Sequence, residues 1–178
     1  PGNILLDSWC QLQLATAYDH NGDWGAGGTL NLSLLNKLKS HPFFAQPAPK
    51  STGREAFNLA WLKNQLLDFD LPAENIQATL MQLTADSIAD QVNNLGRPIS
   101  EVFVCGGGVF NSGLMQLLAE AIPQSTLSST SKLGLDPNWV EACAFAWLAK
   151  RRIENKPGNL PAVTGASREA ILGGVYLP

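Results

Sequence analysis

The stretch Val102-Phe103-Val104-Cys105-Gly106-Gly107-Gly108-Val109-Phe110-Asn111 places three glycines directly after a short apolar run. The apolar run predicts a strand, and the sequence that follows predicts a helix. Glycine accepts a positive φ and lets a flat or anionic ligand approach the backbone, while a helix start offers free N–H groups. The stretch therefore predicts a ligand-facing turn, with a nucleotide as its natural guest. A tight connection without a ligand remains the alternative, because the pattern G-x-G-x-x-G is not matched.

The rest of the chain predicts helices around a small number of strands. Apolar residues at helical spacing and helix-start signals locate the helices, the longest of which opens at Pro72. The predicted helices span residues 4–17, 30–40, 59–67, 72–94, 112–121 and 136–155, and the predicted strands span 101–105, 125–129 and 170–176. The glycine-rich segment 21–28 is expected to form a turn or a flexible loop. This order of elements predicts a helix-rich α/β fold.

The strand at Val102 is apolar throughout, which is typical of a central strand with a neighbour on each side. Two or three short strands are too few for such a sheet. Residue 1 is proline rather than methionine. We therefore expect residues 1–178 to be one partial domain, the carboxy-terminal part of a longer protein that completes the sheet. The alternative is a trimmed, mostly helical small domain.

Charge and composition exclude several function classes. The chain has 178 residues, 45% of them hydrophobic, which suits one soluble domain. Its formal net charge is -3 and its 12 Lys and Arg are scattered, so no nucleic-acid surface is expected. The one basic cluster, 150–152, lies at an expected helix end, where cations complement the helix dipole. No segment is long enough to span a membrane, and the chain has no signal pattern, so a cytoplasmic protein is expected.

The cysteines and histidines predict no metal site. Cys10, Cys105 and Cys143 form no closely spaced pair and lie in apolar sequence, so buried reduced thiols are expected. His20 and His41 lie in loop-like sequence without partners at ligand spacing, and both are expected on the surface.

Glu141 is the only charged residue between Trp139 and Ala149, in an otherwise apolar helix. A buried carboxylate without a partner would destabilise the fold, so Glu141 should meet a polar ligand or backbone donors. Asn138-x-x-Glu141 also matches a capping box, and from spacing alone this structural interpretation is slightly favoured.

Two further segments combine hydroxyls, glycine and charges. Residues 50–55 (Lys-Ser-Thr-Gly-Arg-Glu) suit the binding of phosphate or sugar oxygens, and residues 164–169 have a similar composition. For the first segment, helix capping by Ser51 or Thr52 is the commoner use of such a string. Spacing does not decide between the two.

Five strings, in order, resemble the carboxy-terminal half of the anhydro-N-acetylmuramic acid kinase family: PGNILLDSW, HPFFAQPAPKSTGREAFN, VCGGGVFN, WVEACAFAWLA and PGNLPAVTGASREAILG. The resemblance covers nearly the whole chain. It implies the actin-like, sugar-kinase ATPase fold, of which this chain would form the carboxy-terminal ribonuclease-H-like domain, incomplete at its amino-terminal end. It also implies ATP and Mg²⁺ as cofactors, ring opening and phosphorylation of anhydro-N-acetylmuramic acid at O6 in cell-wall recycling, and a homodimer.

The resemblance assigns site residues to two places. Gly106, Gly107, Gly108 and Asn111 would form the adenosine-side turn, and Glu141 would lie toward the sugar. The family's amino-terminal phosphate loop, its phosphate-contacting Asp-Thr-Gly and its general base are not in this sequence, so no catalytic residue is assigned. Because phosphoryl transfer needs those groups, the chain alone is expected to be inactive without its amino-terminal half.

Two other functions remain open from the sequence. An actin-like fragment could be a nucleotide-gated interaction module without enzymatic activity, or the chain could belong to a related kinase for another sugar. An interaction module does not need an acid facing a cleft, so Glu141 distinguishes it from a kinase.

Overall fold

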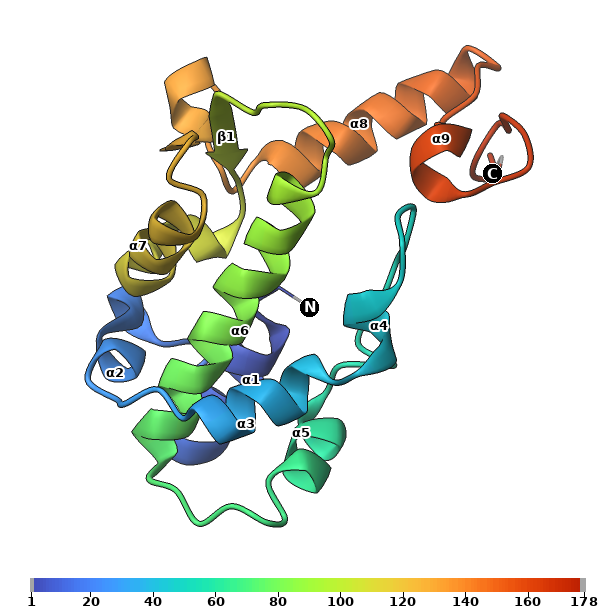
Figure 1. Ribbon diagram of the computed structural model, residues 1–178. Helices are drawn as coiled ribbons and strands as arrows, with labels where there is room; N and C mark the ends of the chain where they lie inside the picture. The colour runs from blue at the N-terminus through green and yellow to red at the C-terminus, as the bar shows by residue number, and fades with distance from the viewer. Residues whose placement is uncertain (1, 177–178) are drawn as a thin grey trace.

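The computed structural model describes residues 2–176 and has the helix-rich α/β composition that the sequence predicts (Figure 1). Its longer helices are α1 (Ile4–Leu14), α3 (Leu32–Lys39), α5 (Leu59–Gln65), α6 (Ala73–Asn93), α7 (Ser112–Ala121) and α8 (Val140–Ile153). Its strands are β1 (Glu101–Val104) and β2 (Thr126–Ser129). Short helical turns are η1 (His20–Gly22), α2 (Asp23–Ala26), α4 (Pro42–Ala45), η2 (Gly107–Phe110), η3 (Thr130–Leu133) and α9 (Pro161–Thr164).

Helix α6 is the centre of the core, and α1, α2, α3 and α7 pack around it (Figure 1). It is apolar or small on several sides, so neighbours can cover it all round. Leu80 and Leu83 are fully buried, and the buried hydroxyl of Thr79 donates to the Asn75 carbonyl oxygen at 2.7 Å. The Trp9 indole N–H donates to the Ala73 carbonyl oxygen at 2.9 Å and fixes α1 against the start of α6.

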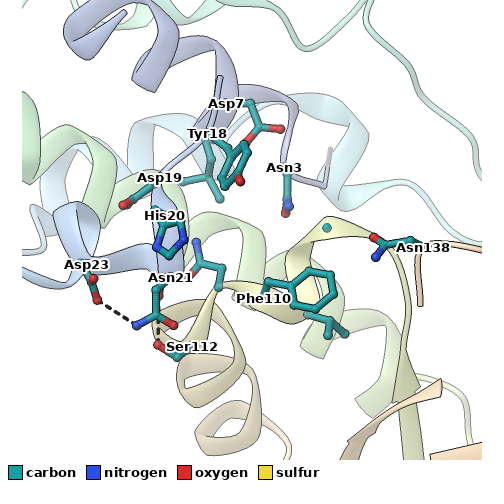
Figure 2. A pocket seen from close by; sticks show the side chains of 14 residues that line it. Asn3, Asp7, Tyr18, Asp19, His20, Asn21, Asp23, Phe110, Ser112 and Asn138 are labelled. Carbon is teal, nitrogen blue, oxygen red and sulfur yellow. Dashed lines mark hydrogen bonds between the residues drawn. The ribbon is translucent and has the colours of Figure 1, made fainter. Parts of the chain in front are cut away.

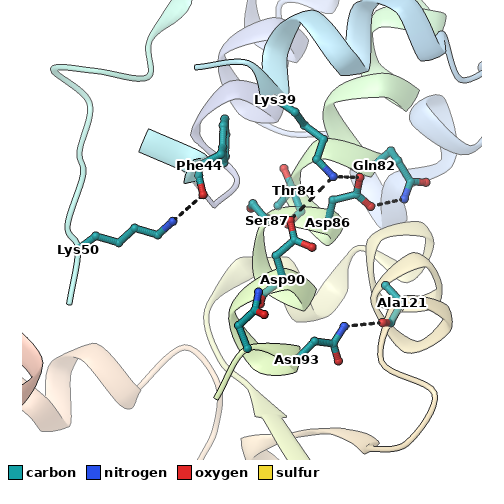
Figure 3. Close-up of polar contacts among 11 residues, drawn as sticks. Lys39, Phe44, Lys50, Gln82, Thr84, Asp86, Ser87, Asp90, Asn93 and Ala121 are labelled. Carbon is teal, nitrogen blue, oxygen red and sulfur yellow. Dashed lines mark hydrogen bonds and ion pairs between the residues drawn. The ribbon is translucent and has the colours of Figure 1, made fainter. Parts of the chain in front are cut away.

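A polar edge of α6 faces α3 (Figure 3). The Lys39 ammonium lies 3.0 Å from the Asp86 carboxylate and 3.8 Å from that of Asp90, and the Gln82 amide donates to Asp86. The three charged groups, Lys39, Asp86 and Asp90, are all partly solvated, so this network fixes the direction of α3 more than it stabilises the fold.

Strands β1 and β2 form a parallel pair with α7 as the connection between them. Glu101 pairs with Thr126 and Val104 with Ser129. Within residues 2–176, β1 has no partner on its second edge. The prediction that this strand has neighbours on both sides is therefore met on one side only.

Helix α8 leaves the helix bundle and runs toward α9 and the carboxy-terminal end of the described chain (Figure 1). No residue of α8 is buried, although most of its residues are apolar. Trp139 just before it is 64% exposed, and Phe145 and Trp147 are 64% and 51% exposed. An apolar helix of this length needs a cover to be stable in water.

Several sequence predictions are wrong in detail. Helix 4–17 ends at Leu14, because Ala15 adopts a left-handed conformation with φ 56°. The segment 21–28 is ordered into η1 and α2, and α4 and α9 were not predicted. Residues 170–176 form no strand; the Ala170 carbonyl oxygen instead accepts a hydrogen bond from the Gly158 N–H at 3.0 Å.

The predictions for thiols and imidazoles are met in part. Cys10 is buried as predicted, but Cys105 and Cys143 are exposed, because nothing within residues 2–176 covers α8 or the end of β1. His20 is exposed as predicted. His41 is half-buried: its Nδ1 accepts a hydrogen bond from the Phe43 N–H at 3.2 Å, and its ring packs on Phe57 at 4.8 Å.

Candidate functional site

A cavity of about 840 Å³ lies where the glycine turn meets the start of α1 and the loop before α2. This volume is in the range of small-molecule and cofactor sites. Its lining comes from four segments and includes Asn3, Asp7, Tyr18, His20, Asn21, Asp23, Gly107, Phe110, Asn111 and Asn138 (Figure 2).

The glycine turn has the backbone that the sequence predicts, and helix α7 begins at Ser112 as predicted. Gly106 has φ 77°, which favours glycine, and its N–H donates to the Pro137 carbonyl oxygen at 2.9 Å. A Cβ atom on Gly107 would meet no atom within 4 Å, so the cavity reaches the backbone there. Gly107 and Gly108 belong to the turn η2, and residues 109–111 separate them from α7, so the α7 amino terminus is not directly beside the glycines.

Asn111 joins three parts of this wall. Its side-chain oxygen caps α7 by accepting from the Leu114 N–H at 2.8 Å. A Cβ atom on Gly22 would collide with this side chain, so glycine is needed for the loop to approach. The Ser112 hydroxyl also donates to the Asn21 carbonyl oxygen at 2.9 Å. The loop that presents His20 and Asn21 is therefore fixed on the start of α7.

Asp19 fixes the same loop through hydrogen bonds to backbone N–H groups. Its buried carboxylate accepts from the Trp24 N–H at 3.0 Å and from the Gly25 N–H at 2.8 Å. These bonds account for Asp19 as a structural residue. Asp7 differs, because within residues 2–176 no hydrogen bond or ion pair involves its carboxylate. Burial raises the pKa of the Asp7 carboxyl above its ordinary value.

Exposed aromatic side chains line opposite parts of the cavity. Tyr18 and His20 stack with their ring centroids 6.4 Å apart, and Phe110 lies on the side of the cavity nearer to Asn138 (Figure 2). Tyr18 is 59% exposed and Phe110 is 55% exposed. Aromatic faces that open into a polar cavity suit a flat heterocycle.

The structure brings some of the predicted site residues together. Gly107 and Asn111 line the cavity, and Asn138, at the entrance to α8, lines it as well. Gly106 and Gly108 support the turn without lining the cavity, and a Cβ atom on Gly108 would lie 3.2 Å from the Asn3 side chain. Glu141 does not line it; it is exposed on the first turn of α8, and no hydrogen bond to it occurs in the described part of the chain.

The predicted capping interpretations are wrong. Helix α8 begins at Val140, so Trp139 rather than Asn138 stands at its cap position, and the Asn138 N–H donates to the Asp136 carboxylate at 2.8 Å instead of to Glu141. The capping box between Asn138 and Glu141 is therefore not formed. Helix α5 is capped by Asn58 rather than by Ser51 or Thr52, and the Asn58 side chain accepts from the Trp61 N–H at 2.9 Å.

Sequence reasoning missed Asp7 and the loop residues Tyr18, His20 and Asn21. The signal for Asp7 was available: it is the only charged residue in segment 4–17, as Glu141 is in its own helix. The loop gave no such signal, because its approach to α7 depends on the fit between Gly22 and Asn111.

Among residues 2–176, no group of three or more His, Cys, Asp or Glu side chains could hold a metal ion. No helix in the described ranges is long and apolar enough to cross a membrane.

Comparison with known proteins gives consistent matches over the full chain. A family model described as anhydro-N-acetylmuramic acid kinase matches residues 1–178. An anhydro-N-acetylmuramic acid kinase of Saccharophagus degradans is 52% identical over 180 residues, covering 100% of this chain and 48% of the relative. A kinase of the same name from Shewanella sp. (strain W3-18-1) is 55% identical over 177 residues, covering 99% and 48%.

This chain spans about half the length of the curated relatives that it matches, and it corresponds to their carboxy-terminal half. The matched residues include the glycine turn, the cavity-lining loop and α8. The chain therefore belongs to the anhydro-N-acetylmuramic acid kinase family.

Proposed function

We propose that this chain is the carboxy-terminal half of an ATP-dependent kinase for anhydro-N-acetylmuramic acid. The intact enzyme would open the 1,6-anhydro ring with water and transfer the γ-phosphoryl group of ATP to O6, in peptidoglycan recycling. The observation that carries the proposal is the cavity of about 840 Å³ at the glycine turn, in a chain of this family. The described residues would then form part of a carboxy-terminal ribonuclease-H-like domain.

ATP would bind this cavity with its base and ribose near the glycine turn. Gly107 leaves the backbone open, and the rings of Phe110 and Tyr18 offer apolar faces to a purine. Gly106 and Gly108 would hold the turn, and Asn111 would hold both α7 and the loop that closes the cavity. The chemistry that ATP supplies is an activated phosphoryl group; the chain supplies its position.

Glu141 would face the sugar when the protein is complete. It lies one turn after Asn138, which lines the cavity, and its carboxylate is exposed. A carboxylate there can accept hydrogen bonds from sugar hydroxyls or position a water molecule. The described residues do not form a carboxylate cluster for Mg²⁺, so we assign no metal ligand to them.

The other half of the family's chain would cover α8 and the free edge of β1. Both surfaces are apolar or unpaired in residues 2–176, and the relatives are about twice as long as this chain. Covering exposed apolar side chains such as Phe145 and Trp147 would contribute roughly 1.5–3 kcal/mol for each one that becomes fully buried. We also propose a homodimer and a cytoplasmic location for the intact enzyme.

Phosphoryl transfer tests this proposal. The chain alone, incubated with ATP, Mg²⁺ and anhydro-N-acetylmuramic acid, should form no phosphorylated sugar, and the chain joined to its amino-terminal half should form it. Glu141→Gln in the joined protein should lower kcat by about 100-fold or more, as expected for a group that orients a reacting water. An unchanged kcat in Glu141→Gln would remove Glu141 from the reaction. Absence of phosphorylated sugar with the joined protein would favour an interaction module, and turnover by the chain alone would refute the division of function.

A further inference from the structure

The second cavity, about 370 Å³, is lined by Ile4, Asp7, Thr52, Gly53 and Arg54. It combines the first turn of α1 with the segment 50–55, whose composition suits phosphate or sugar oxygens. Asp7 lines both this cavity and the larger one. A ligand in each cavity would therefore be adjacent at Asp7, which is the arrangement that group transfer between two ligands requires.

The segment 50–55 has two cationic side chains, of which Lys50 is hydrogen-bonded and Arg54 has no partner within residues 2–176. The Lys50 ammonium donates to the carbonyl oxygens of Phe43 and Phe44, each at 3.0 Å, so it has a structural role. Figure 3 shows the bond to Phe44. Arg54 is exposed, and no ion pair or side-chain hydrogen bond to it occurs in residues 2–176. Its guanidinium is free to bind an anion.

The backbone of this loop is fixed by local contacts. The Gly53 carbonyl oxygen accepts from the N–H groups of Ala56 at 3.2 Å and Phe57 at 3.1 Å. A Cβ atom on Gly53 would meet only the Glu55 carboxylate, at the end of an exposed side chain. Phe57 is fully buried and anchors the loop in the core. Arg54 and Thr52 are thus held at the cavity by a constrained turn.

The two charged groups in this cavity have opposite signs but form no ion pair within 4 Å. A guanidinium is a good partner for a carboxylate, and a carboxylate is a good acceptor for a hydroxyl. A ligand that carries both an anionic group and hydroxyls would satisfy the two together. Sugars with an attached carboxylic acid belong to this class.

We propose that the second cavity binds the carboxylate-bearing side of the acceptor sugar, with Arg54 paired to the carboxylate and Asp7 accepting a hydrogen bond from a sugar hydroxyl. This inference rests on the proposed kinase function. In this arrangement Arg54 determines the specificity for acidic over neutral anhydro sugars. Asp7 lies between the sugar and the nucleotide, because it lines both cavities.

The test compares two sugars with the kinase that carries this chain as its carboxy-terminal half. The acidic sugar is anhydro-N-acetylmuramic acid, and the neutral one is the same anhydro amino sugar without the lactyl carboxylate. Arg54→Ala should lower kcat/KM for the acidic sugar by about 10- to 100-fold, mainly through KM, and change the value for the neutral sugar less than about twofold. Arg54→Lys should be intermediate, since lysine keeps the charge but loses the two-pronged pairing.

Controls separate this inference from the kinase assignment. Arg97→Ala removes an exposed arginine that lines neither cavity and should change neither sugar's kcat/KM. Calorimetric titration with the acidic sugar measures binding without turnover and should show the same loss for Arg54→Ala. An unchanged preference between the sugars in Arg54→Ala would overturn the inference while the kinase stands. Absence of turnover by the wild-type protein on either sugar would overturn the proposed function instead.

Discussion

Helices α1 and α8 are both apolar and each carries a single acid in its first two turns, yet their surroundings are opposite. Helix α1 buries Leu5, Leu6, Trp9 and Cys10 against the core. Helix α8 buries none of its residues. Both segments are rich in apolar residues, so the difference lies in what covers each helix within residues 2–176.

The comparison also changes how the acids are interpreted. Asp7 lies between two cavities that the described chain already forms, whereas Glu141 lies on a helix whose cover is absent from residues 2–176. The surroundings of Asp7 are thus formed by the described residues, whereas those of Glu141 would be completed by the amino-terminal half of the proposed kinase.

The largest effect on stability should come from a substitution in the buried core around α6 and α1. Leu80→Ala in the centre of α6 removes a fully buried side chain and leaves a cavity. It should lower the free energy of unfolding by about 2–5 kcal/mol. Chemical denaturation of the isolated chain measures this value. A loss below about 1 kcal/mol would show that α6 is not the centre of a packed core.

A smaller loss is expected where the core meets the cavity. Asn111→Ala removes the cap of α7 and should cost about 0.5–2 kcal/mol in denaturation. Asn31→Ala is a matched control, because Asn31 caps α3 in the same way, accepting from the Leu34 N–H at 2.8 Å, but does not line either cavity. Only Asn111→Ala should also weaken binding of ATP in the intact protein. Equal ATP binding by both variants would remove Asn111 from the cavity's function.

Asp7→Asn should stabilise the isolated chain at neutral pH. Burial raises the pKa of the Asp7 carboxyl above its ordinary value of 3.8, so the folded chain holds this proton more tightly than the unfolded chain. Stability from this group is fully present below pH 3.8 and is lost as the pH rises through the raised value in the folded protein.

The stability gained by Asp7→Asn should therefore shrink as the pH falls and the Asp7 carboxyl becomes protonated in the folded chain. The other ionisable groups that line the same cavities are Tyr18, Asp19, His20, Asp23 and Arg54. Thermal unfolding from neutral to acidic pH measures the effect, and the intact kinase should lose activity in the same variant. Destabilisation at neutral pH would mean that the carboxylate has a favourable partner in the fold.

The smallest effect is expected on α8. Phe145→Ala in the isolated chain should change the free energy of unfolding by less than about 0.5 kcal/mol, because the ring is 64% exposed. In the protein joined to its amino-terminal half, the same change should cost several times more. Equal effects in both proteins would show that the other half does not cover this helix.

Much of the fold follows from local patterns in the sequence. The segment 112–121 is a helix with the predicted bounds, and the predicted strands at 101–105 and 125–129 are present with slightly shorter bounds. These elements are short-range features: an apolar run, a glycine break and a capped start. The end of α1 at Ala15 depends on a left-handed residue that no local pattern of apolar spacing reports.

The candidate site was less predictable, because it depends on contacts between distant segments. The loop at Asn21 is held by Ser112 at 2.9 Å, and the glycine turn is held by Pro137 at 2.9 Å. Neither contact leaves a spacing signal. Asp7 could have been found by the rule that selected Glu141, since a lone acid in an apolar helix needs a polar ligand or a backbone partner.

Thiol labelling of the isolated and joined proteins tests most directly whether the amino-terminal half covers α8. Cys143 lies exposed on α8, and Cys10 is buried in α1 and serves as an internal control. A maleimide, followed by mass spectrometry, should modify Cys143 rapidly in the isolated chain and slowly in the protein joined to its amino-terminal half, with Cys10 protected in both. Equal modification of Cys143 in both proteins, or protection in the isolated chain that grows with its own concentration, would contradict this account.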